Sequence, residues 1–407
     1  MIMLDQWPDL RDYEIILGDC LIKMREIPSE SIDAILTDPP YGLGFMGKAW
    51  DVSVPGVEWA RECLRVLKPG GHLIAFGGTR TIHRLTCAIE DAGFEIRDMI
   101  SWLYFSGFPK NHAIGKAIDR EAGAEREITG KISGGYGTFK QEYQIKQGYR
   151  PDNGSKGYKG EREGLLRRDK PKTEEAQRFE GFGTALKPAQ EPAVLARKPI
   201  EKGLTIAQNV LKYGVGAINI DDCRFGYGDS CWVGPQDESG LKPYTRQVPQ
   251  RESQAANHQN VTYRDHHLGR WPANIYQCPK PSRAEREAGL SHLKKKTSRS
   301  SMNLGNGQGE RFDGAPSPEV LNIHPTVKPI TLFRWLSRLI GGEKGNTILD
   351  PFSGSGTTGC AALLESYNFI GIEREKEYIP IIEGRCEWAK NQYKIENAQL
   401  SLFDEIR

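Results

Sequence analysis

Two short segments of the chain combine residue types that could carry out chemistry. The first is Asp38-Pro39-Pro40-Tyr41, which joins a carboxylate, two prolines and an aromatic ring. Successive prolines fix φ and remove two backbone donors, so the carbonyls of Asp38 and Pro39 can be presented as acceptors to another group. Such acceptors beside the flat ring of Tyr41 suit an exocyclic amine that stacks on it. Standing alone, however, the segment would more often be a proline turn after an edge strand.

The second segment is a glycine-rich turn, Asp350-Pro-Phe-Ser-Gly-Ser-Gly356-Thr-Thr. An apolar strand-like run precedes it and a helical run follows, so a ligand could approach the free N–H groups of a helix N-terminus. Glu373, 23 positions after Asp350, ends the next expected strand, where a carboxylate could bind two ribose hydroxyls. No Lys follows the second glycine, which excludes a P-loop. Because Asp350 would repel a pyrophosphate and suit a cation, the turn favours S-adenosylmethionine, which has a sulfonium.

The runs around these segments alternate between the apolar periods of strands and helices. This alternation occurs in an N-terminal and a C-terminal region, and it predicts an α/β fold with a doubly wound, mostly parallel, Rossmann-like sheet. A large insertion interrupts the sheet. The expected strands are 13–20, 32–41, 72–78, 96–105, 346–350 and 368–373, and the expected helices are 58–67, 81–92, 331–340, 357–365 and 377–390.

The charge of the chain is unevenly distributed, although its formal net charge is only +2. Residues 131–311 contain 31 Lys and Arg against 20 Asp and Glu, a balance of +11, so the remainder carries −9. Cations alternate with aromatic residues in this middle region, which would attract a phosphate polymer. An ordinary solvated insertion would show the same pattern. Within the region, the apolar run 192–199 could return to the sheet as a strand.

Composition excludes several classes of protein. A length of 407 residues with 38% hydrophobic residues is sufficient for a large core, and no uncharged apolar span of 18 residues occurs. The N-terminus lacks the features of a secretory or mitochondrial signal, so we expect an intracellular protein. The eight cysteines form no Cys-x-x-Cys pair, which favours reduced, buried thiols over a disulfide frame or a metal site.

With His324-Pro-Thr-Val-Lys-Pro329, the two segments resemble the motifs of the β-class amino-group DNA methyltransferases, which modify N6 of adenine or N4 of cytosine. The segments 181–199 and 269–275 are also similar to DNA methylases of bacterial and phage type. The resemblance is weakest for 131–180 and 225–265. It implies a catalytic half at 1–110, a basic and mobile insertion at 111–184, a returning strand at 185–199, a target-recognition region at 200–322 and a cofactor-binding half at 323–407.

The resemblance implies that Asp38, Pro39, Pro40 and Tyr41 are catalytic. The Asp38 carboxylate and the Pro39 carbonyl would accept hydrogen bonds from the target amine, localise its lone pair and stabilise positive charge during in-line attack on the methyl group. Tyr41 would stack on the base, which must first leave the duplex. The implied S-adenosylmethionine site consists of Asp19, Cys20, Asp38, Thr326, Lys328, Asp350, Phe352, Gly354, Ser355, Gly356, Thr357 and Glu373.

Several members of this set have individual expected roles. Asp350 would lie near the methionine end of the cofactor, Glu373 on the ribose and Asp19 near the adenine. Thr326 and Lys328 would bind the methionine carboxylate, for which a hydroxyl and an ammonium are suitable partners. Asp19 could instead be a helix N-cap, and Lys328 a solvated surface residue.

Alternative functions remain open from sequence. Within the family the Asp38 variant of the tetrapeptide favours adenine over N4-cytosine. A catalytically silent DNA-binding fold, an RNA methyltransferase and a protein-glutamine methyltransferase are the other candidates. We expect double-stranded DNA as partner, a homodimer and no membrane association, for a bacterial or phage-encoded protein in the cytoplasm that is associated with the nucleoid through DNA. Candidate base readers in the insertion are Arg246, Arg251, Asn257, Gln259, Asn260, Arg264 and Arg299.

Overall fold

The computed structural model of the chain describes residues 12–44, 49–107, 111–131, 167–226, 229, 231, 244–249, 258–263, 269–297 and 319–405. Two compact units divide the chain. Unit 1 comprises residues 1–106, 189–302 and 317–407, and unit 2 comprises 107–188 and 303–316. In the described ranges, no helix combines the length and the apolar character needed to span a bilayer. Both motif-bearing regions belong to unit 1.

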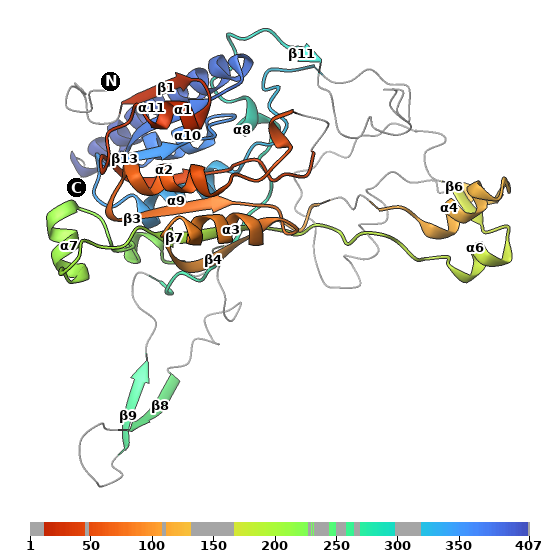
Figure 1. The fold of residues 1–407 in the computed structure, drawn as a ribbon, viewed down its shortest axis with the longest axis horizontal. Helices are drawn as coiled ribbons and strands as arrows, with labels where there is room; N and C mark the ends of the chain where they lie inside the picture. Colours follow the sequence, from red (N-terminus) through yellow and green to blue (C-terminus); the bar gives the residue numbers. More distant parts are fainter. Residues whose placement is uncertain are drawn as a thin grey trace. The chain divides into compact units, whose positions relative to one another are not determined.

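The described part of unit 1 is built on an eight-stranded sheet with the order β1-β14-β13-β2-β3-β7-β4-β10 (Figure 1). The first five strands in this order are parallel to one another, whereas β7 is antiparallel to both β3 and β4. The strands are β1 (Tyr13–Leu17), β2 (Ile32–Thr37), β3 (Leu67–Phe76), β4 (Glu95–Leu103), β7 (Gln190–Arg197), β10 (Ile275–Gln277), β13 (Thr347–Asp350) and β14 (Asn368–Glu373).

The C-terminal region enters the sheet beside the first strands of the chain. Strand β13 pairs with β2, with Ile348 opposite Ala34, and β14 lies between β13 and β1. The two alternating regions of the sequence therefore build one sheet, and the predicted doubly wound, mostly parallel fold is confirmed. Because β1, β2, β13 and β14 are parallel, their carboxyl ends meet at one edge, where such folds bind ligands.

Helices cover both faces of this sheet, so its central strands are buried on both sides. In β2, Ile35 packs with α2 and α3 on one face, whereas Ala34 and Leu36 pack with α9 and α10 on the other. Residues Trp59, Ala60, Cys63 and Val66 form the buried side of α2, at helical spacing. The helices of unit 1 include α1 (Cys20–Met24), α2 (Val57–Val66), α3 (Ile82–Asp91), α7 (Ile206–Tyr213), α8 (Arg283–Glu287), α9 (Ile330–Ile340), α10 (Thr357–Leu364) and α11 (Ile379–Glu405).

Some elements differ from the sequence-based expectation. The segment 68–71, expected to be a turn between a helix and a strand, is part of β3, where the pairing with β2 shifts register. Gly70 permits this irregularity because its φ is +83°. The short helix α1 was expected only under the alternative interpretation of Asp19 as a helix N-cap, since five residues give too little periodicity to detect. The run 192–199 corresponds to β7, which lies between β3 and β4.

Unit 2 contains α4 (Ile114–Glu121), β5 (Glu127–Lys131), β6 (Arg167–Lys170) and α6 (Glu174–Arg178), with β5 and β6 antiparallel. The buried carboxylate of Asp119 accepts hydrogen bonds from the backbone N–H groups of Lys172 and Thr173 at 3.1 and 3.0 Å. The Arg126 guanidinium lies 3.5 Å from Asp119 and 2.9 Å from Glu180. Residues 132–166 of the expected insertion lie outside the described residues, and its mobility stays a prediction.

The antiparallel pair β8 (Tyr244–Pro249) and β9 (His258–Tyr263) belongs to the expected target-recognition region. In this hairpin Arg246 lies opposite Val261, and Asn260 lies opposite Gln247. Gln259 lies opposite Val248 in the same backbone ladder. The other candidate base readers lie outside the described residues: Arg251, Asn257, Arg264 and Arg299. Their proposed roles stay predictions.

Candidate active site

The ends of β2 and β13 bring the two motifs together. The Thr37 hydroxyl donates to Asp350 Oδ1 at 2.6 Å, and the Thr358 hydroxyl donates to Asp350 Oδ2 at 2.5 Å. Thr37 is the residue immediately before the tetrapeptide, and Thr358 follows the glycine turn. The tetrapeptide 38–41, called the proline corner below, and the glycine turn therefore share one edge of the sheet, although they lie more than 300 residues apart in sequence.

At the proline corner, Asp38 faces a hydroxyl and an ammonium. The Tyr41 hydroxyl donates to Asp38 Oδ1 at 2.8 Å, and Lys328 Nζ donates to Asp38 Oδ2 at 2.5 Å. Lys328 Nζ also lies 3.0 Å from the Tyr41 oxygen and 3.1 Å from Glu191 Oε2. The Tyr41 oxygen is 3.2 Å from the same Glu191 oxygen. Two carboxylates, one phenol and one ammonium thus form a closed polar cluster.

Burial and charge act in opposite directions on this cluster. Burial raises the pKa of Asp38, and the nearby Lys328 ammonium offsets the rise only in part. Burial would also lower the pKa of Lys328, but the charges of Asp38 and Glu191 outweigh it and the pKa is raised. For Glu191, the ammonium groups of Lys328 and Lys280 outweigh burial and lower the pKa. Lys328 therefore stays charged and Glu191 stays ionised at neutral pH.

Glu191 reaches the cluster because β7 is antiparallel to its neighbours. The first residues of an antiparallel strand lie at the edge where the parallel strands end. Ala193 lies opposite Phe76, the last residue of β3, and the Gly77 N–H donates to the Pro192 carbonyl at 2.9 Å. Sequence reasoning did not identify Glu191. The signal that could have found it is the acidic residue at the start of a returning strand.

The loop after the tetrapeptide is anchored by a second acid that sequence reasoning missed. Asp51 is 2% exposed, and its Oδ1 accepts hydrogen bonds from the N–H groups of Tyr41 at 2.7 Å and Gly42 at 2.9 Å. These bonds fix the backbone at the Tyr41 ring, which a stacking role requires. Asp51 lies in a short 3-10 turn, Ala49–Asp51, whose sequence gave no sign of this contact.

The glycine turn has the left-handed backbone expected of it. Gly354 and Gly356 have φ values of +54° and +74°, a region that L side chains rarely adopt. The Gly354 N–H donates to Glu373 Oε2 at 2.8 Å, and the Glu375 N–H donates to Oε1 at 2.7 Å. Each Glu373 oxygen keeps a lone pair, which fits two ribose hydroxyls. Burial raises the pKa of Glu373 to about 7.

Asp350 is committed to contacts within the protein. It is 2% exposed, and besides the two threonine hydroxyls its Oδ1 accepts from the Phe352 N–H at 3.0 Å. Burial raises its pKa to about 6, against the lowering effect of these hydrogen bonds. Oδ1 joins the turn to Thr37 of β2, and Oδ2 joins it to Thr358 of α10. The expected contact of Asp350 with the cofactor stays a prediction.

Side chains of α11 and α2 contact the other residues of the glycine turn. Arg385 is fully buried, and its Nη1 donates to the Ser355 carbonyl at 2.9 Å and lies 3.4 Å from the Thr357 hydroxyl. The Phe352 ring lies 5.8 Å from Trp59, centroid to centroid. Arg385 was missed by sequence reasoning because its position in a long helix gives no hint of the loop that it contacts.

Asp19 and Cys20 lie where β1 meets β14. The Gly18 N–H donates to the Glu373 carbonyl at 2.9 Å, which places the end of β1 beside the end of β14. Asp19 is the N-cap of α1, with Oδ1 accepting from the Leu21 N–H at 2.9 Å, as the alternative interpretation held. Its expected contact with adenine stays a prediction. Burial and the Asp19 charge raise the pKa of Cys20 to about 12, so this thiol stays protonated.

The segment 324–329 crosses over the glycine turn. Burial lowers the pKa of His324 to about 3, so the neutral ring donates from Nδ1 to the Thr326 carbonyl at 2.7 Å. A Cβ on Gly354 would lie 3.0 Å from His324 Nε2, so the imidazole rests directly on the turn. Lys328 lies against Asp38, and it is not a solvated surface residue. The roles of Thr326 and Lys328 toward a methionine carboxylate stay predictions.

The described residues contain no group of three or more His, Cys, Asp or Glu side chains arranged to hold a metal ion. All eight cysteines are free thiols.

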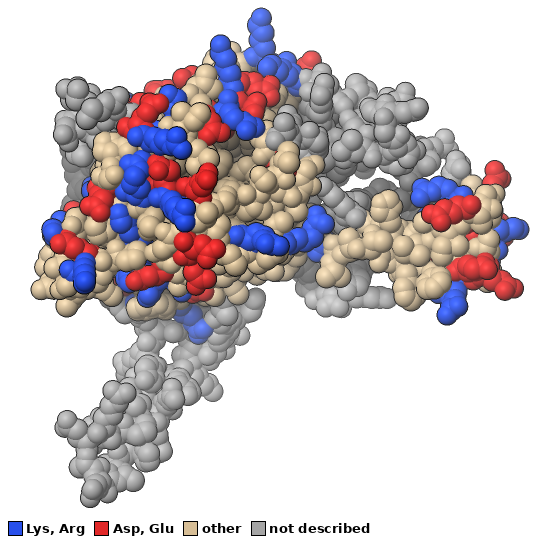
Figure 2. Space-filling model, in the orientation of Figure 1, with Lys and Arg blue, Asp and Glu red and all other residues tan. Residues whose placement is uncertain are grey.

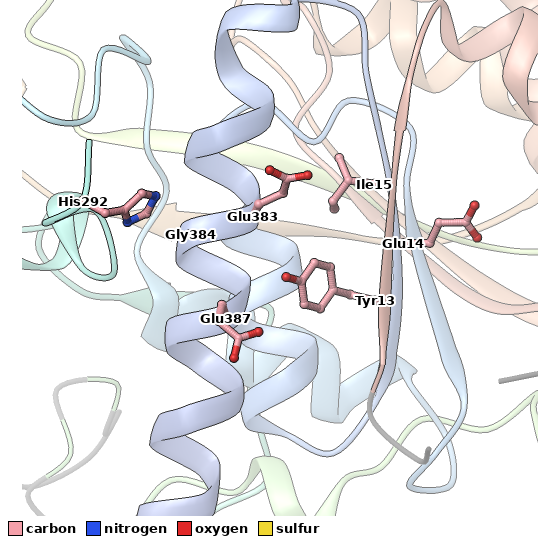
Figure 3. A pocket seen from close by; sticks show the side chains of 7 residues that line it. All are labelled: Tyr13, Glu14, Ile15, His292, Glu383, Gly384 and Glu387. Carbon is pink, nitrogen blue, oxygen red and sulfur yellow. The ribbon is translucent and has the colours of Figure 1, made fainter. Parts of the chain in front are cut away.

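A separate hollow lies between β1 and α11 (Figure 3). Its volume is about 540 Å³, and three carboxylates, from Glu14, Glu383 and Glu387, line it together with Tyr13, Ile15, His292 and Gly384. None of these residues belongs to the proline corner or the glycine turn. Its negative charge would repel a phosphate or a carboxylate, so we do not place the reaction there.

The charged residues of unit 1 are mixed on the visible face. Figure 2 shows Lys and Arg interspersed with Asp and Glu over this part of the molecule. Much of the basic region 131–311 lies outside the described residues, so the described surface in this view gives no continuous basic track for DNA.

Comparisons with known proteins agree on one family. A sequence model of the family described as DNA methylase matches residues 32–384. The type II methyltransferase M.HindIII of Haemophilus influenzae is 22% identical over 418 residues, covering 92% of this chain and 95% of that protein. M.HinfI of Haemophilus influenzae is 32% identical over 109 residues, 22% of this chain and 30% of M.HinfI. M2.MboI of Moraxella bovis is 52% identical over 77 residues, 17% of this chain and 27% of M2.MboI.

The higher identities are thus confined to segments that span less than a third of those two relatives. Among solved structures, the PvuII DNA methyltransferase, described as cytosine-N4-specific, matches with a TM-score of 0.43 at 15% identity over 94% of this chain and 92% of that chain. The M1.HpyAVI–SAM complex matches with a TM-score of 0.38 at 17% identity, over 92% and 98% of the two chains.

Proposed function

Because the chain belongs to the N6/N4 amino-group DNA methylase family, we propose that it methylates N6 of adenine at specific sites in double-stranded DNA. S-adenosylmethionine is the methyl donor of this family and supplies an electrophilic methyl group on its sulfonium. We infer that the protein acts in the cytoplasm as a homodimer, as part of a restriction-modification system.

The observation that carries this proposal is the contact between the two motifs. Thr37 joins the Asp38 corner to Asp350 of the glycine turn through a hydrogen bond of 2.6 Å. The groups that would accept the protons of an amine, at Asp38 and Pro39, and the glycine turn that would bind a nucleoside are therefore neighbours. Glu373 fits the ribose, because each of its oxygens accepts only one backbone N–H bond.

The chain's own residues would make the target amine nucleophilic. An adenine amino nitrogen is a poor nucleophile because its lone pair is delocalised into the ring. Hydrogen bonds from its two protons to the Asp38 carboxylate and the Pro39 carbonyl would draw the nitrogen toward tetrahedral geometry. The same carboxylate would stabilise the positive charge that develops on nitrogen as the N–C bond forms and the C–S bond breaks. The nitrogen would then release one proton to water, which leaves a neutral methylated amine and S-adenosylhomocysteine.

Two further residues would position the base. Pro40 stiffens the corner through its fixed φ, and Tyr41, held by Asp51 through its backbone N–H, would offer its ring as a stacking surface. The base must leave the duplex first, at a cost of a few kcal/mol. Asp38 as the first residue of the tetrapeptide supports adenine as the target.

The test is single-molecule sequencing of DNA from cells that express the protein, beside cells that express Asp38→Ala. We expect a modified adenine in one recurring sequence, absent from the variant. Mass spectrometry of the nucleosides identifies the base independently. Detection of N4-methylcytosine would show that the target is cytosine and not adenine. Unmodified DNA would indicate a catalytically silent DNA-binding fold.

Light scattering of the purified protein tests the homodimer. A molar mass near 45.6 kDa, that of one chain, would contradict it.

A further inference from the structure

The Lys328 ammonium lies on the Asp38 carboxylate, the acceptor proposed above for the target amine. Its ammonium has three protons and three oxygen neighbours: Asp38 Oδ2 at 2.5 Å, the Tyr41 hydroxyl at 3.0 Å and Glu191 Oε2 at 3.1 Å. Lys328 is 6% exposed, and its Nζ lies 5.3 Å from the ring centres of both Tyr41 and Phe76. The Lys328 nitrogen is positively charged, contacts Asp38 and Tyr41 and packs against aromatic rings. A target amine that gains positive charge during methyl transfer would have the same charge and the same neighbours.

This arrangement conflicts with methyl transfer unless Lys328 shifts. Asp38 Oδ1 accepts from the Tyr41 hydroxyl and Oδ2 accepts from the Lys328 ammonium, so a target amine that binds this carboxylate would share it with a cation. An ammonium that stayed on Oδ2 would also repel the positive charge that develops on the target nitrogen.

Glu191 offers Lys328 an alternative partner. Its Oε2 already lies within 3.1 Å of Nζ, so the ammonium needs only a small movement to leave Asp38 and remain paired. Lys280, whose ammonium lies 4.3 Å from the ring centre of Tyr104, acts with Lys328 to keep Glu191 ionised. Without this second carboxylate, the displaced lysine would be a buried charge with no anionic partner, which costs several kcal/mol.

We propose that Glu191 is a positioning residue for methyl transfer, which takes the Lys328 ammonium when the flipped base enters and thereby frees Asp38 Oδ2 for the target amine. This inference rests on the proposed function. Glu191 touches neither substrate in this role and acts through Lys328. No bond is made or broken in the exchange, and the lysine keeps all its protons.

The test compares Glu191→Gln with the matched control Glu201→Gln. Glu201 also accepts from a lysine and a tyrosine, Lys212 and Tyr213, but at a partly exposed position beside α7. With Glu191→Gln we expect kcat/KM for DNA to fall about tenfold to a hundredfold, the effect of losing one hydrogen bond to a charged group. The KM for S-adenosylmethionine should stay within about twofold of that of the wild type, because the glycine turn is unchanged.

Two further measurements separate positioning from a merely structural role. In a Lys328→Met background, Glu191→Gln should change kcat/KM for DNA by less than about twofold, since no ammonium remains to be moved. A duplex with an abasic target position has no amine to displace Lys328. The wild type and Glu191→Gln should therefore bind this duplex equally.

Three results would overturn the inference: wild-type kinetics in Glu191→Gln, an equal loss with and without Lys328, or weakened binding of the abasic duplex. A wild-type protein that transfers no labelled methyl group to DNA would instead refute the proposed function, and the inference would fall with it. The control Glu201→Gln should match the wild type in every measurement.

Discussion

Two carboxylates at the same sheet edge, Asp38 and Asp350, are held in different ways. Asp38 is paired with the Lys328 ammonium and one phenol, whereas Asp350 accepts only from two threonine hydroxyls and a backbone N–H. Burial raises the pKa of both. The partners of Asp350 lie within the rigid sheet and turn, but the long side chain of Lys328 can move. The difference indicates that Asp38 can exchange its partner, and that Asp350 fastens two halves of the fold together.

The largest expected effect is on the Asp38 side of this comparison. Asp38→Asn should lower kcat by about 10²–10³-fold, because a neutral amide stabilises the developing positive charge poorly. Binding of S-adenosylmethionine, measured by calorimetry, should persist. A variant with kcat within about threefold of the wild type would remove Asp38 from the mechanism.

On the cofactor side, Glu373→Gln should raise the KM for S-adenosylmethionine about tenfold, the cost of losing one charged hydrogen-bond acceptor to the ribose. Its effect on kcat should be small, since the ribose is remote from the reacting atoms. Initial rates at varied cofactor concentration give both constants. An unchanged KM with a reduced kcat would contradict the ribose assignment.

Asp350 should affect stability more than rate. Asp350→Ala should lower the free energy of unfolding by at least about 1–3 kcal/mol, the cost of one buried donor left without an acceptor. Thr37 and the Phe352 N–H both lose their acceptor in this variant. Asp350→Asn, which keeps the shape and one acceptor oxygen, should lose less. Denaturant unfolding measures both, and equal stability of Asp350→Ala and the wild type would refute the fastening role.

The last expected effect is a pH dependence of the stability. The pKa of Glu373 is raised from 4.5 to about 7 and that of Asp350 from 3.8 to about 6, so the folded state binds protons more tightly than the unfolded state. The contribution of these two groups to the free energy of unfolding therefore decreases as pH rises from about 4 to 7. Relative to the wild type, cofactor-free Glu373→Gln should gain stability over this range, by no more than about 3 kcal/mol.

Glu58→Gln, at an exposed position of α2, is the control for this experiment and should show the wild-type profile. If the free energy of unfolding of Glu373→Gln changes with pH in the same way as that of the wild type, burial of the Glu373 carboxylate does not destabilise the folded protein.

The sequence predicted the parts of the site that depend on local patterns. The positions of the proline corner, the glycine turn and Glu373 at the ends of strands are confirmed, because each stands at the end of an apolar strand-like run, and their roles toward the base and the cofactor stay predictions. The order of strands and helices in both flanks was found for the same reason. The family and the cofactor, inferred from the joint motifs, are confirmed by the match over residues 32–384.

Residues whose role depends on distant pairing were not found. Glu191 lies at the start of β7 with nothing in the local sequence to mark it, and only the antiparallel direction of this strand brings it to Lys328. Asp51 lies in a short turn, and Arg385 lies in a long helix. Their partners, the N–H of Tyr41 and the carbonyl of Ser355, belong to other segments of the chain.

By itself the sequence determined which residues could carry out chemistry and which elements they end, because periodicity, prolines and glycines act within a few residues. Only the tertiary structure decided that Lys328 faces Asp38 and that Glu191 stands beside both. The order and direction of the strands set those contacts. Strand order and direction in turn depend on the burial of apolar side chains between the sheet and the helices on its two faces, to which residues from the whole chain contribute.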